Sequence, residues 1–196
     1  MAEVVGKLRD KGVMDNTYVF FTSDNGVHRG EHRIPGDKGR PYEEDVHIPL
    51  LVRGPGVAAG HRAHKLALNT YYLPTFTDLA CTSSSPCNTQ NWTYVPDGRA
   101  IRPVLKGIAT TWRSTILLEA HQMNASSIPS YYGVRTSDKK YLEYEGGKKE
   151  LYSLGHDPYE LSNRYPATTP SAELVSRLHA LKTCAGGRCR AAENGQ

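Results

Sequence analysis

Three features are missing from this 196-residue sequence, and each absence excludes a class of protein. No stretch approaches the roughly 18 consecutive apolar residues of a transmembrane helix, so we expect no membrane partner. Lysine and arginine never cluster densely, so we expect no nucleic-acid partner despite a net charge of +4. The opening residues, MAEVVGKLRD, lack the apolar core of a secretory signal peptide.

Cysteine is scarce, but the four residues present fall into two close pairs, Cys81 with Cys87 and Cys184 with Cys189. Paired cysteines favour disulfides and an oxidising compartment. Metal binding is the alternative, although the spacings C-x5-C and C-x4-C fit zinc poorly. We therefore predict two disulfides.

Two N-glycosylation sequons support the same compartment, one at Asn91 and one at Asn124. Together with the cysteine pairs they predict an extracytoplasmic protein, whether secreted, lysosomal or periplasmic. Because no export signal accompanies these features, we expect the chain to be the C-terminal part of a longer protein. No pattern in the sequence predicts an oligomeric state.

The first 80 residues alternate between helical and strand patterns, as is typical of α/β proteins. Residues 2–11 have apolar positions at helical spacing, and Gly12 is suited to end that helix. Residues 17–22 and 48–52 are continuous apolar runs, which predict strands buried on both faces. Residues 66–80 predict a short strand and then a helix, with Asn69 or Thr70 as the N-cap.

The pattern changes in the second half of the chain. Four short strand-forming segments separated by turn residues predict an antiparallel sheet, at residues 114–119, 131–135, 140–144 and 150–154. Residues 100–105 predict one or two helical turns, and leucines at helical spacing predict a helix over residues 172–181. The hairpin segment 136–150 is basic, so it is either a solvated hairpin or a contact for an anionic polymer.

The run YVFFTSDNG places polar residues directly after the first strand. In α/β sheets, ligands bind at the carboxyl ends of strands. Asp24 and Asn25 are adjacent oxygen donors that suit a hard cation, Ca²⁺ with Mg²⁺ as the alternative. The same Ser-Asp-Asn-Gly sequence is also common in plain turns, so both interpretations stay open at this point.

Three more residues of this loop carry groups that could act on a ligand. Lys38 precedes Gly39 and could neutralise an oxyanion, or it could be a solvated loop lysine. His28 and His32 could be acid–base groups or sugar contacts, or only polar loop residues. No one of these residues decides between the interpretations.

The order of the motifs is more specific. The run YVFFTSDNG followed by DKGRPYEEDVHIPLLVRGPG resembles the type I sulfatases of the alkaline phosphatase-like superfamily, and especially their glucosamine-6-sulfatase and arylsulfatase branch. The similarity continues through LALNTYYLPTFTDLA, DGRAIRPVLKG and YGVRTSDKKYLEYEGGKKELYSLGHDPYELSN, so it covers nearly the whole chain.

This resemblance implies a fold and a domain division. The fold class is α/β, the C-terminal part of an alkaline phosphatase-like α/β sandwich followed by a small antiparallel-sheet α+β subdomain. The implied division is catalytic-domain residues 1–80, a disulfide-containing loop 81–98, a subdomain 99–190 and a tail 191–196.

The resemblance also implies residue roles. Asp24 and Asn25 match half of a Ca²⁺ site, Lys38 matches the lysine that binds the sulfate group, and His28 matches a histidine near the substrate pocket. Tyr42 and Glu43 match structural supports of the loop. The implied substrate is a sulfated carbohydrate, such as N-acetylglucosamine 6-sulfate, or an aryl sulfate.

The nucleophile of this family is a formylglycine made from the first residue of Cys/Ser-x-Pro-x-Arg, and that motif is absent here. Segments beginning at Cys81, Ser84 and Ser127 each lack its proline or its arginine. The resemblance places the formylglycine and the remaining Ca²⁺ ligands in a preceding part of the protein. We therefore expect this chain alone to be inactive towards sulfate esters and to bind Ca²⁺ weakly.

Two other functions remain open. The same superfamily includes phosphodiesterases and phosphonate hydrolases, but those tend to place histidine beside the aspartate, where this chain has Asn25. The chain could also be a non-catalytic glycan- or anion-binding module on the same scaffold. Asp24, Asn25 and Lys38 together favour the sulfatase.

Overall fold

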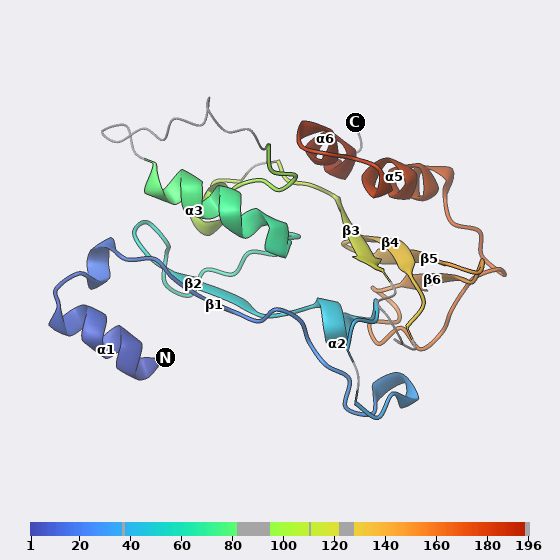
Figure 1. Cartoon of the computed structure of the whole chain (residues 1–196), viewed down its shortest axis with the longest axis horizontal. Helices are drawn as coiled ribbons and strands as arrows, with labels where there is room; N and C mark the ends of the chain where they lie inside the picture. Colours follow the sequence, from blue (N-terminus) through green and yellow to red (C-terminus); the bar gives the residue numbers. More distant parts are fainter. Residues whose placement is uncertain (37, 82–94, 110, 122–127, 195–196) are drawn as a thin grey trace.

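The computed structural model describes residues 1–36, 38–81, 95–109, 111–121 and 128–194. We refer to residues 1–109 as the N-terminal region and to residues 111–194 as the C-terminal region. Figure 1 shows a small sheet with α3 beside it in the first region, and a larger sheet covered by two helices in the second. No helix in the described ranges has the length and apolar character needed to cross a bilayer.

The N-terminal region begins with the predicted helix, α1 (Ala2–Asp10). Gly12 follows with φ +65°, and its N–H donates to the carbonyl of Arg9. This left-handed residue ends the helix, as predicted. The other helices of the region are α2 (Glu43–Val46), α3 (Tyr72–Ala80) and α4 (Arg102–Leu105), with 3-10 turns at Met14–Asn16, Glu31–Arg33 and Asn69–Tyr71.

The two predicted strands of this region, β1 (Val19–Thr22) and β2 (Leu50–Arg53), pair antiparallel. The prediction that both faces are buried is wrong for this chain. Phe20 packs towards the cluster of Tyr71, Ile101 and Leu105, whereas Phe21 is 50% exposed and Leu51, its partner across the ladder, is 59% exposed. Successive strand residues point to opposite faces, and the described chain covers only one face of this pair.

The predicted strand before α3 is absent, and the predicted cap is also wrong. Residues 61–68 are irregular, a 3-10 turn leads into α3, and the N-cap is Tyr71 without a side-chain hydrogen bond. The physical reason lies in a tertiary contact. The amide of Asn69 donates to the backbone carbonyl of Asp24 over 3.2 Å, so it holds the loop after β1 instead of capping a helix.

The C-terminal region contains the predicted antiparallel sheet, with β3 (Thr115–Ala120), β4 (Tyr131–Thr136), β5 (Lys139–Tyr144) and β6 (Lys149–Ser153) in sequence order. Helices α5 (Ala172–Lys182) and α6 (Gly187–Asn194) lie over one face. On that face Tyr141 packs with Leu178 of α5. On the other face Leu142 belongs to a cluster against which Tyr42 and Leu68 of the N-terminal region pack.

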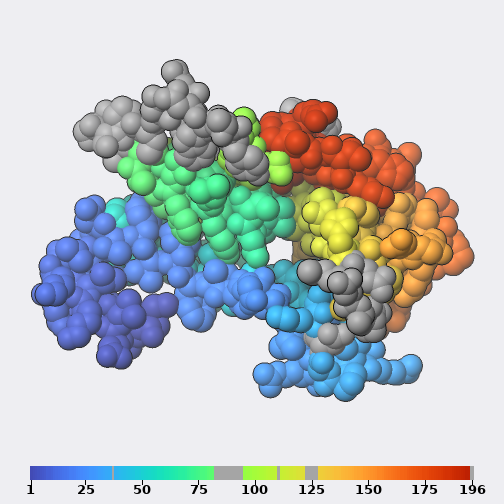
Figure 2. All heavy atoms as spheres, viewed as in Figure 1, coloured from blue at the N-terminus to red at the C-terminus, as the bar shows by residue number. Residues whose placement is uncertain are grey.

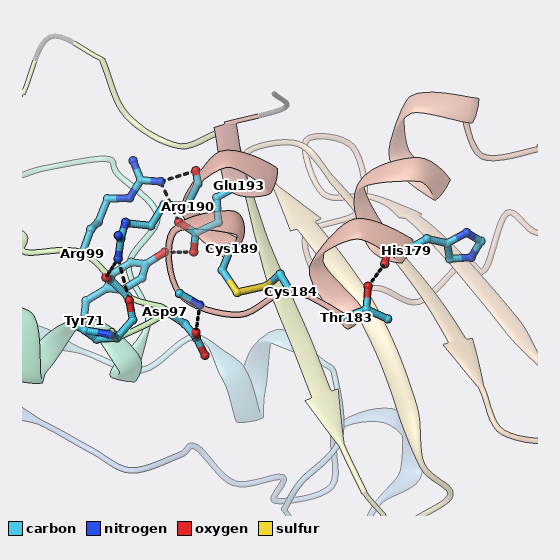
Figure 3. Close-up of a disulfide and its surroundings, with 12 residues drawn as sticks. Tyr71, Asp97, Arg99, His179, Thr183, Cys184, Cys189, Arg190 and Glu193 are labelled. Atoms are coloured by element: carbon cyan, nitrogen blue, oxygen red, sulfur yellow. Dashed lines mark hydrogen bonds and ion pairs between the residues drawn. A yellow bond between two sulfur atoms is a disulfide. The ribbon is translucent and has the colours of Figure 1, made fainter. Parts of the chain in front are cut away.

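Helix α6 was not predicted, and residues 191–194, expected as a tail, belong to it. The predicted disulfide Cys184–Cys189 is confirmed, with Cα atoms 5.0 Å apart, and it joins the end of α5 to α6 (Figure 3). Glu193 of α6 is buried and accepts hydrogen bonds from the Tyr71 hydroxyl at 2.6 Å and from Arg99 at 3.1 Å. These contacts fix the end of the chain to the N-terminal region.

The other predicted modifications involve residues outside the described ranges, namely Cys87, Asn91 and Asn124. Cys81 lies directly after α3. The Cys81–Cys87 disulfide and both glycosylation sites therefore stay predictions.

Candidate functional site

The loop that follows β1 begins with the two predicted cation ligands. The Asp24 carboxylate accepts a hydrogen bond from the Ser23 hydroxyl over 3.2 Å. The backbone N–H of Asn25 contributes most to lowering the pKa of Asp24, and the charge of Lys38 adds a smaller contribution. Asp24 therefore presents an ionised carboxylate at the surface near neutral pH.

Lys38 lies beside this pair. Its Nζ donates to Oδ1 of Asn25 over 3.5 Å, while the amide nitrogen of Asn25 donates to the carbonyl of Gly26 over 2.6 Å. The three residues predicted to act on one ligand, Asp24, Asn25 and Lys38, are thus close together in the structure. Lys38 lies 13 residues after Asn25 in the sequence, and the loop between them folds back so that the two side chains meet.

Asp24 and Asn25 line a cavity of ≈ 830 Å³ between the two regions. Its walls include Asn69 and Tyr72 from the N-terminal region and Leu118 from the C-terminal sheet. The space-filling view in Figure 2 shows the molecule hollowed between the segments of the two regions. A cavity of this size could hold a sugar.

The donor set of this loop meets part of what Ca²⁺ requires. A carboxylate and an amide oxygen are hard donors that suit this ion, which takes six to eight oxygen ligands. Asp24 and Asn25 supply two side chains of this kind, and the Asn25 oxygen also accepts a hydrogen bond from the Lys38 ammonium. The residues present therefore fit part of a Ca²⁺ site.

His28 belongs to the same loop and is completely buried. Its Nδ1 is 3.0 Å from Oδ1 of Asp45, whose other carboxylate oxygen accepts the backbone N–H of Arg40 at 2.7 Å. The backbone N–H of Gly26 donates to the carbonyl of Asp45, and a Cβ at Gly26 would overlap the carbonyl of Glu44. In this chain the His28 ring faces the protein interior, so the substrate contact predicted for it stays untested.

Asp45 is a site residue that the sequence did not predict. It is 3% exposed, and its carboxylate joins the His28 ring to the segment before α2. Its backbone carbonyl accepts the N–H of Gly26 at the start of the loop. Its only sequence signal is the acidic run Glu43–Asp45, which is equally typical of a solvated helix start. Burial, which the sequence does not display, distinguishes Asp45 from its neighbours.

Glu43 shows the structural role expected from the resemblance. Its carboxylate accepts hydrogen bonds from Arg135 at 3.2 and 3.0 Å and forms an ion pair with Lys140 at 2.9 Å. Its backbone N–H donates to Glu160 at 2.7 Å. These contacts anchor α2, and with it one side of the loop, to β4 and β5.

Comparisons with known proteins give the family. Residues 1–82 match the family model described as Sulfatase. The N-acetylglucosamine-6-sulfatase of Bos taurus is 32% identical over 222 residues, which cover 96% of this chain and 38% of the relative. The chain belongs to the sulfatase family. The arylsulfatase of Chlamydomonas reinhardtii is also 32% identical, over 95% of this sulfatase chain and 33% of its own length.

Solved structures confirm the predicted fold class. The structure of BT4656 in complex with its substrate D-glucosamine-2-N,6-O-disulfate has a TM-score of 0.81 at 25% identity, covering 100% of this sulfatase chain and 39% of that chain. The phosphonate monoester hydrolase of Agrobacterium radiobacter shares the fold, with a TM-score of 0.75 at 22% identity over 98% of this chain and 38% of that one. The sulfatase chain thus spans well under half the length of each of these relatives.

Proposed function

We propose that the complete protein hydrolyses sulfate esters of sulfated sugars, such as N-acetylglucosamine 6-sulfate, and that this chain supplies part of its active site. The observation that supports this proposal is the approach of the Lys38 ammonium to 3.5 Å from the Asn25 oxygen, next to the Asp24 carboxylate. In this arrangement an anion-binding ammonium and two cation-binding oxygens are close enough to act together on one sulfate ester.

The chemistry of these groups fits sulfate-ester hydrolysis. Asp24 and Asn25 hold part of a Ca²⁺ site, and a bound Ca²⁺ supplies positive charge that stabilises negative charge on the sulfuryl oxygens. Lys38 neutralises a sulfuryl oxygen as a point charge. A formylglycine in the preceding part of the protein provides the nucleophile.

The relatives support the substrate class and the compartment. The bovine and goat relatives are N-acetylglucosamine-6-sulfatases, and a Drosophila melanogaster relative is named as an extracellular sulfatase homologue. We therefore place the complete protein outside the cytoplasm. Residues 1–80 then belong to the catalytic domain, and the C-terminal subdomain begins at residue 99 and extends through α6 to Asn194.

The test is the activity of the complete protein on N-acetylglucosamine 6-sulfate. Lys38→Ala is expected to lower kcat/KM by about 10²–10³-fold, because it removes a positive group that faces the transferred charge. Lys139→Ala, which removes an exposed lysine of β5, is the charge-matched control and should leave kcat/KM unchanged. Equal activity of the two variants, or preference for a phosphonate ester over the sulfate ester, would contradict the proposal.

The chain by itself provides a second test. The purified 196-residue chain should show no turnover of an aryl sulfate and only weak Ca²⁺ binding by calorimetry. The full-length protein should show an aldehyde at its Cys/Ser-x-Pro-x-Arg motif by mass spectrometry. Turnover by the chain alone would overturn the proposed division of the active site.

A further inference from the structure

Three buried ligand atoms, two from the loop after β1 and one from α2, lie close together and have no hydrogen-bond partner among the described residues. They are Nε2 of His28, Nε2 of His32 and Oε2 of Glu44. All three lie within 4.8 Å of one another, with the Glu44 oxygen 4.0 Å from His28 and 3.4 Å from His32. A buried polar atom without a partner is costly and requires an explanation.

The distances suit a small divalent cation. With metal–ligand bonds of about 2.0–2.1 Å, two ligands of a tetrahedral ion lie about 3.3 Å apart. The distances of 3.4 and 4.0 Å are slightly wider, so a small inward movement of the side chains would complete the geometry. A set of two imidazoles and one carboxylate is typical of zinc sites with an open fourth position.

The surroundings hold these ligands in place. The other ring nitrogen of His28 faces the buried Asp45 carboxylate at 3.0 Å, which is the outer partner that metal-bound histidines commonly have. The His32 ring stacks on Tyr42 with centroids 3.9 Å apart. His32 also has a left-handed backbone with φ 53°, a conformation that costs energy in a residue other than glycine.

We propose that His28, His32 and Glu44 form a binding site for a borderline divalent cation of the zinc class. The site joins the loop after β1 to α2, so its role is to hold the loop that carries Asp24 and Lys38. It differs from the proposed Ca²⁺ site in both residues and chemistry, because imidazole nitrogens favour zinc, cobalt or copper and oxygen donors favour calcium. It does not depend on the sulfatase activity proposed above.

The test is metal binding by the chelator-treated 196-residue chain, with Zn²⁺ measured by calorimetry and Co²⁺ by visible absorption. One equivalent of Zn²⁺ should bind, excess Ca²⁺ should not displace it, and Co²⁺ should give the absorption of a tetrahedral site. His32→Ala and Glu44→Gln each remove one ligand near the edge of the cluster and should weaken Zn²⁺ binding at least about tenfold. His156→Ala, which removes an exposed histidine, is the matched control and should bind Zn²⁺ as the parent does.

The competing interpretation is an ion pair between His32 and Glu44 that binds no metal. If the folded parent chain binds no Zn²⁺, this ion-pair interpretation is correct and the proposed metal site is wrong. Binding that survives both ligand variants, or that Ca²⁺ displaces, would also overturn it. Circular dichroism of every variant establishes that the fold is retained, and the completely buried His28 is left unchanged for that reason.

Discussion

The two regions of this chain differ in how much of their apolar surface the chain itself covers. Of the 18 buried hydrophobic residues in the described ranges, proline not counted, four lie in the N-terminal region, namely Met14, Tyr71, Ile101 and Leu105. Helix α1 has no buried residue, and Phe21 and Leu51 expose one face of the small sheet. The C-terminal sheet, in contrast, is covered on both faces.

This difference matters for the site because the loop with Asp24 and Lys38 belongs to the less covered region. Part of its support comes from the C-terminal region. Glu43 in α2 is held by Arg135 and Lys140 of the larger sheet, and Asn69 holds the Asp24 backbone. The C-terminal region therefore stabilises the loop of the candidate site, to which it contributes no predicted ligand.

The contrast can be tested most strongly by one substitution made in both regions. Leu178→Ala in α5 removes a side chain with 0% exposure and should lower the free energy of unfolding by about 4 kcal/mol. Leu51→Ala in β2 removes a side chain that is 59% exposed and should change it by at most about 0.5 kcal/mol. Urea unfolding followed by circular dichroism measures both values. Similar losses in the two variants would mean that the exposed face is covered in solution.

The connection between the regions is tested by Glu43→Gln. Burial by itself would raise the pKa of Glu43, but the hydrogen bonds from Arg135 and the charge of Lys140 outweigh it and lower this pKa to about 2. A depressed pKa stabilises the fold at pH values above the ordinary value of 4.5, and the effect is lost as the pH falls towards 2. The variant should therefore be about 3 kcal/mol less stable near pH 7.

The pH dependence gives this prediction its control. The difference in unfolding free energy between the parent and Glu43→Gln should shrink steadily between about pH 4.5 and pH 2. Glu160 titrates in both proteins; burial is the main cause that raises its pKa, and the charge of Glu43 raises it further, so its contribution differs between the two curves. A difference that is the same at pH 7 and pH 2.5 would show that Glu43 acts through packing alone.

The same contrast explains which parts of the fold the sequence predicts. Short strand-forming segments separated by turn residues predict the C-terminal sheet correctly, because the chain itself supplies cover for both faces: the adjacent residues Tyr141 and Leu142 enter opposite clusters. For β1 the apolar run predicts burial on both faces, and Phe21 contradicts this because one face is uncovered. The local sequence pattern predicts which residues can be buried. Whether they are buried depends on the segments that pack over them, which lie far away in the sequence.

The candidate site divides in a similar way. The local signals at Asp24, Asn25 and Lys38, a strand end and a lysine before glycine, left their roles open, and the order of the motifs favoured a shared site; the structure brings the three residues together. The buried Asp45 and the contact of Asn69 with the loop could not be predicted, because each depends on a tertiary approach. Helix α6 was missed for the same reason, since Glu193 is stabilised by Tyr71 and Arg99 rather than by an apolar repeat of its own.

A smaller effect is expected from the disulfide within the C-terminal region. Replacing Cys184 and Cys189 by serine together opens a short covalent loop and should lower the free energy of unfolding by about 2 kcal/mol. Because Cys189 precedes Glu193 in α6, hydrogen exchange should rise in α6 more than in β4 or β5 (Figure 3). An unchanged exchange rate in α6 would show that Glu193 and its partners hold this helix without the disulfide.

The smallest effect on stability is expected at Lys38, and it separates a ligand-binding lysine from a structural one. Lys38 is exposed, so Lys38→Ala should change the free energy of unfolding by at most about 0.5 kcal/mol. Lys140 is completely buried between Glu43 and Glu160, and Lys140→Ala should cost about 3 kcal/mol or more because it leaves buried carboxylates unpaired. If Lys38→Ala destabilised the chain as much as Lys140→Ala does, Lys38 would be a support of the loop, and a loss of activity in that variant could no longer be attributed to sulfate binding.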